Sequence, residues 1–285
     1  MDIHVVQPGD TLYRLARQYG VPMDRLLHDN QLPDPSQLVV GQTIVIRYPA
    51  LTYTVQEGDT LWSIAQTHAS TVRALLRNNP NLQGKDLLYP GQVLVIQYQD
   101  RPQGSLVVNS YAYPWIDRSL LTATLPYLSQ LTPFAHRFTS DGALISLQDK
   151  ALISAALQSG VAPLLCLANL DENDRFSSQL VHQLLSSDQA QARLIAALVE
   201  EAQRKGYRGV DVDFEYVYGD DATAYAAFLS RLREALSPKG LPLSVALAAK
   251  TRDDQPGRLY EGHDYGLIAK AVDYALLMTY DWGYV

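Results

Sequence analysis

The chain has 285 residues, of which 47% are apolar and 19% are charged, and its formal net charge is −7. This composition is typical of a folded globular protein long enough for two domains, and it excludes a largely disordered chain. No basic run is present, which argues against nucleic acid as a partner. The longest nearly unbroken apolar stretch, Val161 to Leu170, is far shorter than the roughly 20 residues of a membrane-spanning helix, so no membrane partner is expected.

Metal and disulfide chemistry have little support in the residue inventory. The single cysteine, Cys166, excludes an intrachain disulfide and a multi-cysteine zinc site, and it lies in an apolar run typical of a buried position. The six histidines show no metal-ligand spacing. We therefore expect neither a metal nor a cofactor.

The first hundred residues contain an internal repeat. Residues 6–13 (VQPGDTLY) recur at 55–62 as VQEGDTLW, and the similarity continues to Gly41-Gln42 and Gly91-Gln92. In each copy an alternating strand, 4–6 or 53–55, leads into a Gly-Asp-Thr turn that can cap a helix. A first helix ends before Gly20 in the first copy; a second helix is predicted over 23–29 and 72–77, and a closing strand over 43–47 and 93–97. Two small modules with the order strand, helix, helix, strand are predicted.

These repeats resemble the LysM carbohydrate-binding module over residues 2–48 and 51–98. The resemblance implies binding of peptidoglycan or chitin-like polymers of N-acetylglucosamine in a shallow groove between the GDTL loop and the loop after the second helix. The implied groove residues are Gly9, Asp10, Thr11, Leu12, Leu32 and Pro33 in the first module and Gly58, Asp59, Thr60, Leu61, Pro80 and Leu82 in the second. The alternative for the Gly-Asp-Thr residues is turn and cap chemistry alone. Two tethered weak sites on one polymer would gain avidity.

A second domain is predicted over residues 106–285, after a polar linker at 99–105. Strands are predicted over 106–113, near 136–139, and over 163–168, 209–215, 243–249 and 274–280. Amphipathic helices over 189–205 and 223–236 alternate with them. This alternation predicts an α/β domain with a parallel sheet, and β/α barrels carry their catalytic groups at the carboxyl ends of the strands.

Three carboxylates occupy alternate positions of the predicted strand 209–215. Asp211, Asp213 and Glu215 would share one face, each roughly 7 Å from the next. A central strand has no solvated face, and burying neighbouring carboxylates raises the pKa of at least one of them, as a general acid requires. The pattern favours a catalytic site; the alternative is a solvated strand edge.

These acids carry a second resemblance. The segment 208–215 resembles the D-G-x-D-x-D-x-E catalytic strand of glycoside hydrolase family 18, with Arg208 in place of the first Asp. The segment 278–282 (MTYDW) resembles the M-x-Y-D segment at the end of the family's sixth strand. The resemblance implies a glycosidase that acts by substrate-assisted retaining hydrolysis, in which the substrate's 2-acetamido oxygen is the nucleophile.

The resemblance also implies a role for each residue. Glu215 would be the general acid, Asp213 would orient the acetamido group, and Asp211 would tune Asp213. Tyr280 would bind the acetamido oxygen and Asp281 would contact the sugar. Substrate binding would extend to Met278 and Trp282, and Trp115, near a strand end, is a further candidate for stacking on a sugar.

The combination of repeats and acids resembles the spore-germination subgroup, the cortex-lytic N-acetylglucosaminidases. It implies a place in the spore coat or cortex or in the cell wall, and no signal peptide is visible before the first repeat. Two alternatives stay open. One is a non-catalytic LysM glycan-binding protein of the coat or wall with a degenerate barrel, and the other is a chitinase.

The strand count departs from a complete barrel. A (β/α)8 barrel of the TIM type has eight strands in about 250 residues, whereas about six strands are recognisable from residue 106 onward. We therefore expect an incomplete barrel, truncated at its C-terminus, because six strands cannot close by tilt and shear. A poorly stable second domain with low activity is the expected consequence.

Overall fold

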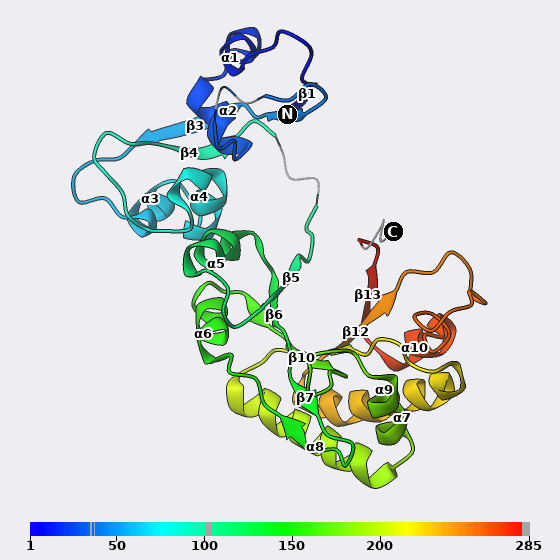
Figure 1. The fold of residues 1–285 in the computed structure, drawn as a ribbon. Coiled ribbons are helices and arrows are strands. Elements are labelled where there is room, and N and C mark those ends of the chain that lie inside the picture. The colour runs from blue at the N-terminus through cyan, green and yellow to red at the C-terminus, as the bar shows by residue number, and fades with distance from the viewer. Residues whose placement is uncertain (35, 37, 101–103, 281–285) are drawn as a thin grey trace. The chain divides into compact units, whose positions relative to one another are not determined.

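The computed structural model describes residues 1–34, 36, 38–100 and 104–280. The chain forms two compact units, one of residues 1–107 with 117–128 and the other of residues 108–116 with 129–285. We call them the repeat unit and the strand–helix unit; Figure 1 traces the chain through both. Part of the predicted linker, 101–103, lies outside the described residues. Among the described helices none combines the length and the apolar character needed to cross a membrane.

Each copy of the repeat folds as strand, helix, helix, strand, as predicted. The first copy comprises β1 (Asp2–Val5), α1 (Leu12–Tyr19), α2 (Met23–Asp29) and β2 (Thr43–Ile46). The second comprises β3 (Pro49–Thr54), α3 (Leu61–Thr67), α4 (Val72–Asn78), the 3-10 turn η1 (Pro80–Leu82) and β4 (Val93–Tyr98). The two strands of each copy pair antiparallel. Helix α5 (Arg118–Thr124) and the 3-10 turn η2 (Leu125–Tyr127) also belong to this unit.

The Gly-Asp-Thr residues carry out the turn and cap chemistry considered above. Gly9 and Gly58 have φ angles of +86° and +83°, in the left-handed region that favours glycine. The Thr11 hydroxyl accepts a hydrogen bond from the Arg14 N–H, and Thr60 forms the equivalent cap on α3. These residues therefore have a structural role in each module.

An asparagine joins the second helix to the closing strand in each module, half-buried in the first and fully buried in the second. The Asn79 side-chain amide donates to the carbonyls of Leu75 and Val95, both at 2.9 Å, and its Oδ1 accepts from the Val95 N–H at 2.8 Å. Asn30 makes the same contacts in the first module, with Leu26 and Val45. The amide thus substitutes for a neighbouring strand, because it pairs with both the N–H and the C=O of one residue.

Removing this amide should destabilise the module. We expect Asn79→Ala to lower the free energy of unfolding of the second module by about 2–4 kcal/mol, because it leaves the main chain of Val95 without partners inside the protein. Hydrogen exchange of β4 measures the effect, and Asn81→Ala, at an exposed position of the same loop, is the matched control. Equal exchange in the two variants would contradict the prediction.

Parallel strands follow one another through the strand–helix unit in chain order. One parallel sheet contains β5 (Asn109–Ala112), β6 (Gln130–Pro133) and β9 (Ala162–Pro163). The other contains β10 (Leu165–Ala168), β11 (Val210–Asp213), β12 (Leu243–Ala248) and β13 (Tyr274–Met278). Only Leu164 separates β9 from β10, and a parallel bridge joins His136 to Leu167. The carboxyl ends of these strands therefore lie at one edge.

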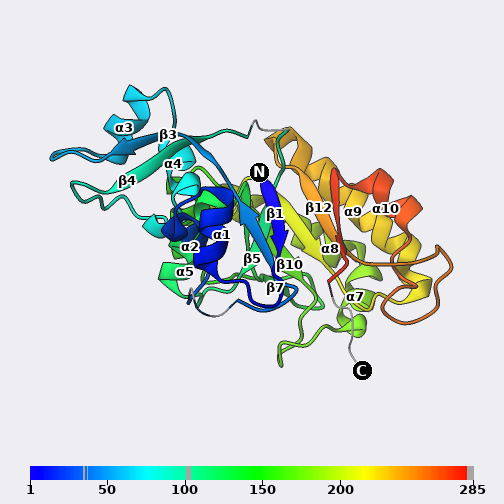
Figure 2. The same cartoon turned by 90° about the horizontal axis from the view of Figure 1, so that it is seen from above.

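Helices cover one side of the four-stranded sheet. Figures 1 and 2 show α8 (Asp188–Lys205), α9 (Ala222–Leu236) and α10 (Tyr265–Ala271) lying along it. The unit also contains α6 (Lys150–Gln158), α7 (Ser178–Leu185) and the 3-10 turns η3 (Gly219–Asp221) and η4 (Ser237–Lys239). Leu198 of α8, Phe228 of α9 and Val212 of β11 meet in the core between the layers. This apolar layer packs against β11 on the helical side of the sheet and fixes its position.

Of the strand predicted near 136–139, only His136 pairs with a parallel sheet, through its bridge to Leu167. Residues Arg137–Phe138 form β7, which pairs antiparallel with β8 (Leu144–Ile145) in a short hairpin. The second parallel strand is β6, which the sequence pattern missed; it ends in Pro133, and proline is depleted in strands. The strand predicted over 209–215 ends at Asp213, so Glu215 lies beyond the ladder.

Candidate active site

A cavity of about 830 Å³ lies at the carboxyl ends of the parallel strands. Its size is within the usual range for ligand sites. Aromatic rings supply much of the lining: Tyr111, Tyr113, Trp115, Phe134, Phe176 and Tyr280. The charged side chains in the lining are Asp213, Glu215, Arg137 and Asp174. The cavity therefore combines flat apolar surfaces with two neighbouring carboxyls.

Asp211 lies beneath the cavity and does not line it. Its carboxylate accepts hydrogen bonds from the Tyr111 hydroxyl at 2.7 Å and the Ser244 hydroxyl at 2.5 Å, and the side chain is buried. Burial raises its pKa, while the two hydroxyls oppose that shift. Asp211 is thus held by side chains of β5 and β12, in a position to act on Asp213 through charge.

Asp213 is a strongly perturbed carboxyl at the cavity wall. Burial, then the charges of Glu215 and Asp211, raise its pKa from 3.8 to about 8. Its Oδ1 has no hydrogen-bond partner within the described residues. A protonated carboxyl at neutral pH can donate a hydrogen bond as well as accept one. The pair formed by Asp213 and Glu215 can therefore hold and transfer a proton.

Glu215 is half-buried and reaches the same cavity from the turn that follows β11. The next residue, Tyr216, has a φ of +56°, in the left-handed region. Non-glycine residues seldom adopt this conformation, and those that do are often found at functional sites. The chain therefore bends sharply directly after Glu215.

The structure brings some of the other predicted residues to this cavity. Met278, at the end of β13, and Tyr280 both line it, and Tyr280 is 61% exposed. Asp281 and Trp282 lie outside the described residues. Trp115 also lines the cavity and stacks on Tyr113, with ring centroids 4.6 Å apart and an interplanar angle of 13°. Tyr113 is one of the residues that the sequence analysis did not single out.

Three of the predicted groove residues belong to the module cores. The side chains of Leu12, Leu61 and Leu82 are 1%, 2% and 6% exposed, and they pack in the two apolar clusters of the repeats. Their side chains are therefore not available to a glycan, so a contact at these positions would come from the main chain. The aromatic residues that follow the first two, Tyr13 and Trp62, are 60% and 66% exposed. Sequence analysis missed these two, although they occupy equivalent positions of the repeat.

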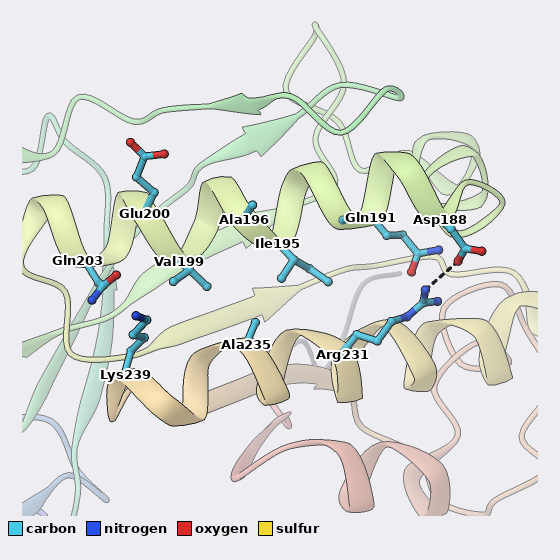
Figure 3. A pocket seen from close by; sticks show the side chains of 11 residues that line it. Asp188, Gln191, Ile195, Ala196, Val199, Glu200, Gln203, Arg231, Ala235 and Lys239 are labelled. Atoms are coloured by element: carbon cyan, nitrogen blue, oxygen red, sulfur yellow. Dashed lines mark hydrogen bonds and ion pairs between the residues drawn. The ribbon is translucent and has the colours of Figure 1, made fainter.

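A second hollow lies on the helical side of the same unit. Figure 3 shows a groove between α8 and α9, where Ile195, Val199 and Ala235 face one another. An ion pair between Asp188 and Arg231, with an N–O distance of 2.7 Å, spans one end. None of the strand-end acids lines this groove, so it is separate from the candidate active site.

Known protein families match both parts of the chain. Residues 4–47 and 53–97 match the LysM domain, and residues 171–284 match glycosyl hydrolases family 18. The chain therefore carries two LysM domains followed by a region that belongs to glycosyl hydrolases family 18. This is the combination expected from the sequence.

Individual relatives share this organisation. The chain is 37% identical over 290 residues to a cortical fragment-lytic enzyme of Bacillus subtilis (strain 168), covering 100% of this chain and 66% of the relative. The crystal structure of the spore cortex-lytic enzyme SleL of Bacillus megaterium QM B1551 aligns with a TM-score of 0.76 and 31% identity, over 99% of this chain and 66% of that one. A chitinase of Chromobacterium violaceum ATCC 12472 aligns with a TM-score of 0.57 and 27% identity, over 62% of this chain and 57% of that one. The chain thus spans 66% of the length of its full-length relatives.

Proposed function

We propose that this chain is a peptidoglycan-binding glycosidase that cleaves glycans containing N-acetylglucosamine. The observation that carries the proposal is the pair of carboxyls, Asp213 and Glu215, in an aromatic-lined cavity at the ends of parallel strands. The family match over 171–284 and the two LysM domains support it. The cortex-lytic relatives support an action on the spore cortex or cell wall. The chain order of the seven described parallel strands supports a (β/α)8-type barrel.

In the proposed mechanism, Glu215 protonates the glycosidic oxygen while the substrate's acetamido oxygen attacks the anomeric carbon. Asp213 passes its proton to Glu215; the resulting carboxylate accepts a hydrogen bond from the acetamido N–H and balances the positive charge of the oxazolinium ring. The buried Asp211 influences the charge on Asp213. Tyr280 hydrogen-bonds the acetamido oxygen. Glu215 then accepts a proton from the water that opens the ring. The stacked pair of Tyr113 and Trp115 holds a sugar ring by its apolar face.

A side pocket favours peptidoglycan over chitin as the substrate. This pocket, about 460 Å³, shares Phe176 with the main cavity and is also lined by Tyr216, the residue after Glu215. Arg258 lines it and makes no hydrogen bond or ion pair to any other described residue, while the guanidinium of Arg175 lies 3.6 Å from Asp171. A free guanidinium beside the cleft suits the carboxylates of peptidoglycan, and chitin carries none.

Arg258→Ala should therefore separate the two polymers. We expect it to lower kcat/KM on peptidoglycan about tenfold, the effect of losing one charge-assisted contact of about 1.4 kcal/mol. Hydrolysis of chito-oligosaccharides should stay unchanged. Arg252→Ala is the matched control, because Arg252 lies in the same loop, pairs with Asp254 at 3.2 Å and does not line the pocket. An equal loss on both polymers would contradict the anionic pocket.

The deciding experiment measures the release of reducing ends from purified spore cortex peptidoglycan by this chain and by its Glu215→Gln variant. Turnover by the chain that the variant lacks is the expected result. No turnover by either, with the glycan still pulled down, would favour the non-catalytic glycan-binding alternative. Turnover of chito-oligosaccharides alone would favour a chitinase.

A further inference from the structure

Asn169 holds the main chain of Glu215 from one side. It directly follows β10, whose last residue, Ala168, is paired with Asp213 at the end of β11. Its Oδ1 accepts from the Glu215 N–H at 2.9 Å, and its amide nitrogen donates to the Glu215 carbonyl at 2.9 Å and the Ser177 carbonyl at 3.1 Å. The side chain is 0% exposed. The amide therefore continues the strand pairing beyond the point where the ladder ends.

His263 holds the preceding residue from the other side. It lies in the loop before α10, and its ring contacts the Phe214 carbonyl through Nε2 at 2.8 Å and the Ala248 N–H through Nδ1 at 3.1 Å. A carbonyl only accepts and an N–H only donates, so Nε2 carries the proton and Nδ1 is the acceptor. Burial lowers the pKa of His263 to about 4, which keeps the ring neutral at physiological pH. The imidazole thus ties the extension of β11 to the end of β12.

The side chain of Phe214 is also fixed. Its ring stacks on Tyr225 and Phe228, with centroids 5.6 Å and 6.0 Å apart, and it is fully buried. The main chain at 214–215 is therefore held by Asn169 and His263, and the intervening aromatic core holds the residue before Glu215. This arrangement leaves the Glu215 side chain to project into the cavity from a rigid base.

We infer that Asn169 and His263 are positioning residues, which hold the main chain at 214–215 so that the Glu215 carboxyl meets the glycosidic oxygen. The inference rests on the proposed function of Glu215. Neither residue lines the cavity, so each acts through the main chain and not through the substrate. A misplacement of about 1 Å in a reacting group can cost a hundredfold in rate. Loss of either contact should therefore lower kcat by about 10- to 100-fold and leave KM within about threefold.

Two substitutions of His263 test its hydrogen bonds to Phe214 and to Ala248 separately. In His263→Gln the side-chain amide can reach the place of Nε2 and donate to Phe214, whereas in His263→Asn it can reach only the place of Nδ1 and accept from Ala248. We expect His263→Asn to lower kcat by about tenfold or more and His263→Gln to retain most of it. Equal kcat values in the two variants, at equal melting temperatures, would overturn the role of the Phe214 contact.

Hydrogen exchange tests Asn169 without relying on catalysis. In Asn169→Leu, which has nearly the same shape, the Glu215 amide should exchange at least about tenfold faster while β12 keeps its protection. Asn173→Leu, in the exposed loop that follows, is the matched control. If Asn169→Leu does not fold, Asn169→Asp retains the acceptor for the Glu215 N–H and should lower kcat without changing exchange at Glu215. Unchanged exchange in a folded Asn169→Leu, or unchanged kcat in either variant, would overturn the inference.

The kcat measurements and the hydrogen-exchange measurements together also separate this inference from the proposed function. If the unmodified chain does not hydrolyse glycan, the proposed function fails and the assignment of Asn169 and His263 to catalysis fails with it. The exchange measurement still reports whether these side chains hold the main chain at 214–215. If the unmodified chain is active and the variants keep full kcat, only the positioning role fails.

Discussion

Glu215→Gln should lower the rate of glycan hydrolysis by at least about a thousandfold. A positioned general acid contributes roughly 10²–10⁴-fold, and glutamine has the same shape but cannot give up a proton at this site. The neighbouring Asp213 cannot replace it, because its deeper burial leaves it 6% exposed and places it below Glu215 in the cavity wall. The measurement is the initial rate of reducing-end release at saturating peptidoglycan.

Two controls make the loss of activity specific. Glu172→Gln makes the same chemical change at an exposed position of the loop after β10 and should leave the rate unchanged. Glycan pull-down by Glu215→Gln should equal that of the unmodified chain, because the LysM domains at 4–47 and 53–97 are left intact. A variant that retains more than about a tenth of the activity would exclude Glu215 as the acid.

Asp213→Asn should have opposite effects on activity and on stability. Activity should fall by about a hundredfold or more, because the amide cannot balance the charge that develops on the acetamido group. Stability should rise at neutral and alkaline pH, because the substitution removes a carboxyl whose ionised form is disfavoured by burial. Such a gain in stability with a loss of function is typical of residues kept for chemistry.

The direction in which stability changes with pH follows from the raised pKa of Asp213. The pKa of Asp213 is about 8 in the folded chain, against an ordinary value of 3.8. Folding therefore favours the protonated form, so the stability associated with this group is complete below pH 3.8 and is lost progressively as pH rises through 8. Relative to the unmodified chain, Asp213→Asn should gain several kcal/mol in the free energy of unfolding between pH 4 and pH 8.

Urea unfolding of both proteins at several pH values measures this difference, and it should be smallest at pH 4. The alkaline limb of the kcat/KM profile offers a second measurement. In the unmodified chain it should fall near pH 8, where Asp213 loses its proton. A stability difference that is independent of pH would show that Asp213 titrates normally.

Asn169 and the two repeat asparagines use one structural device. In each case a side-chain amide pairs with both the N–H and the C=O of a residue on a neighbouring segment. The Asn79 amide joins the second helix of its module to the closing strand, and the Asn169 amide holds the main chain of Glu215, the residue proposed as the acid. Asn30 and Asn79 occupy equivalent positions of the two sequence repeats, whereas Asn169 has no such counterpart.

The sequence by itself determined the two repeats, their order of elements and the location of the acids. Local signals were sufficient there: Thr11 and Thr60 cap helices, Gly20 ends one, and Asp211 and Asp213 alternate along a strand. These features depend on residues within about ten positions of one another. Each is set by backbone geometry and helix or strand period, which a sequence displays directly.

The tertiary structure alone decided which of these residues meet. It placed Leu12 and Leu61 in the module cores, ended β11 before Glu215 and brought Tyr111, Asn169 and His263 to the acids. His263 is 49 residues from Phe214, and the Tyr111 hydroxyl bonds an aspartate 100 residues away. Such contacts arise from the packing of parallel strands in chain order, which brings their carboxyl ends to one edge. No local pattern encodes the partner of a buried amide or imidazole, because that partner is a main-chain group present at every position.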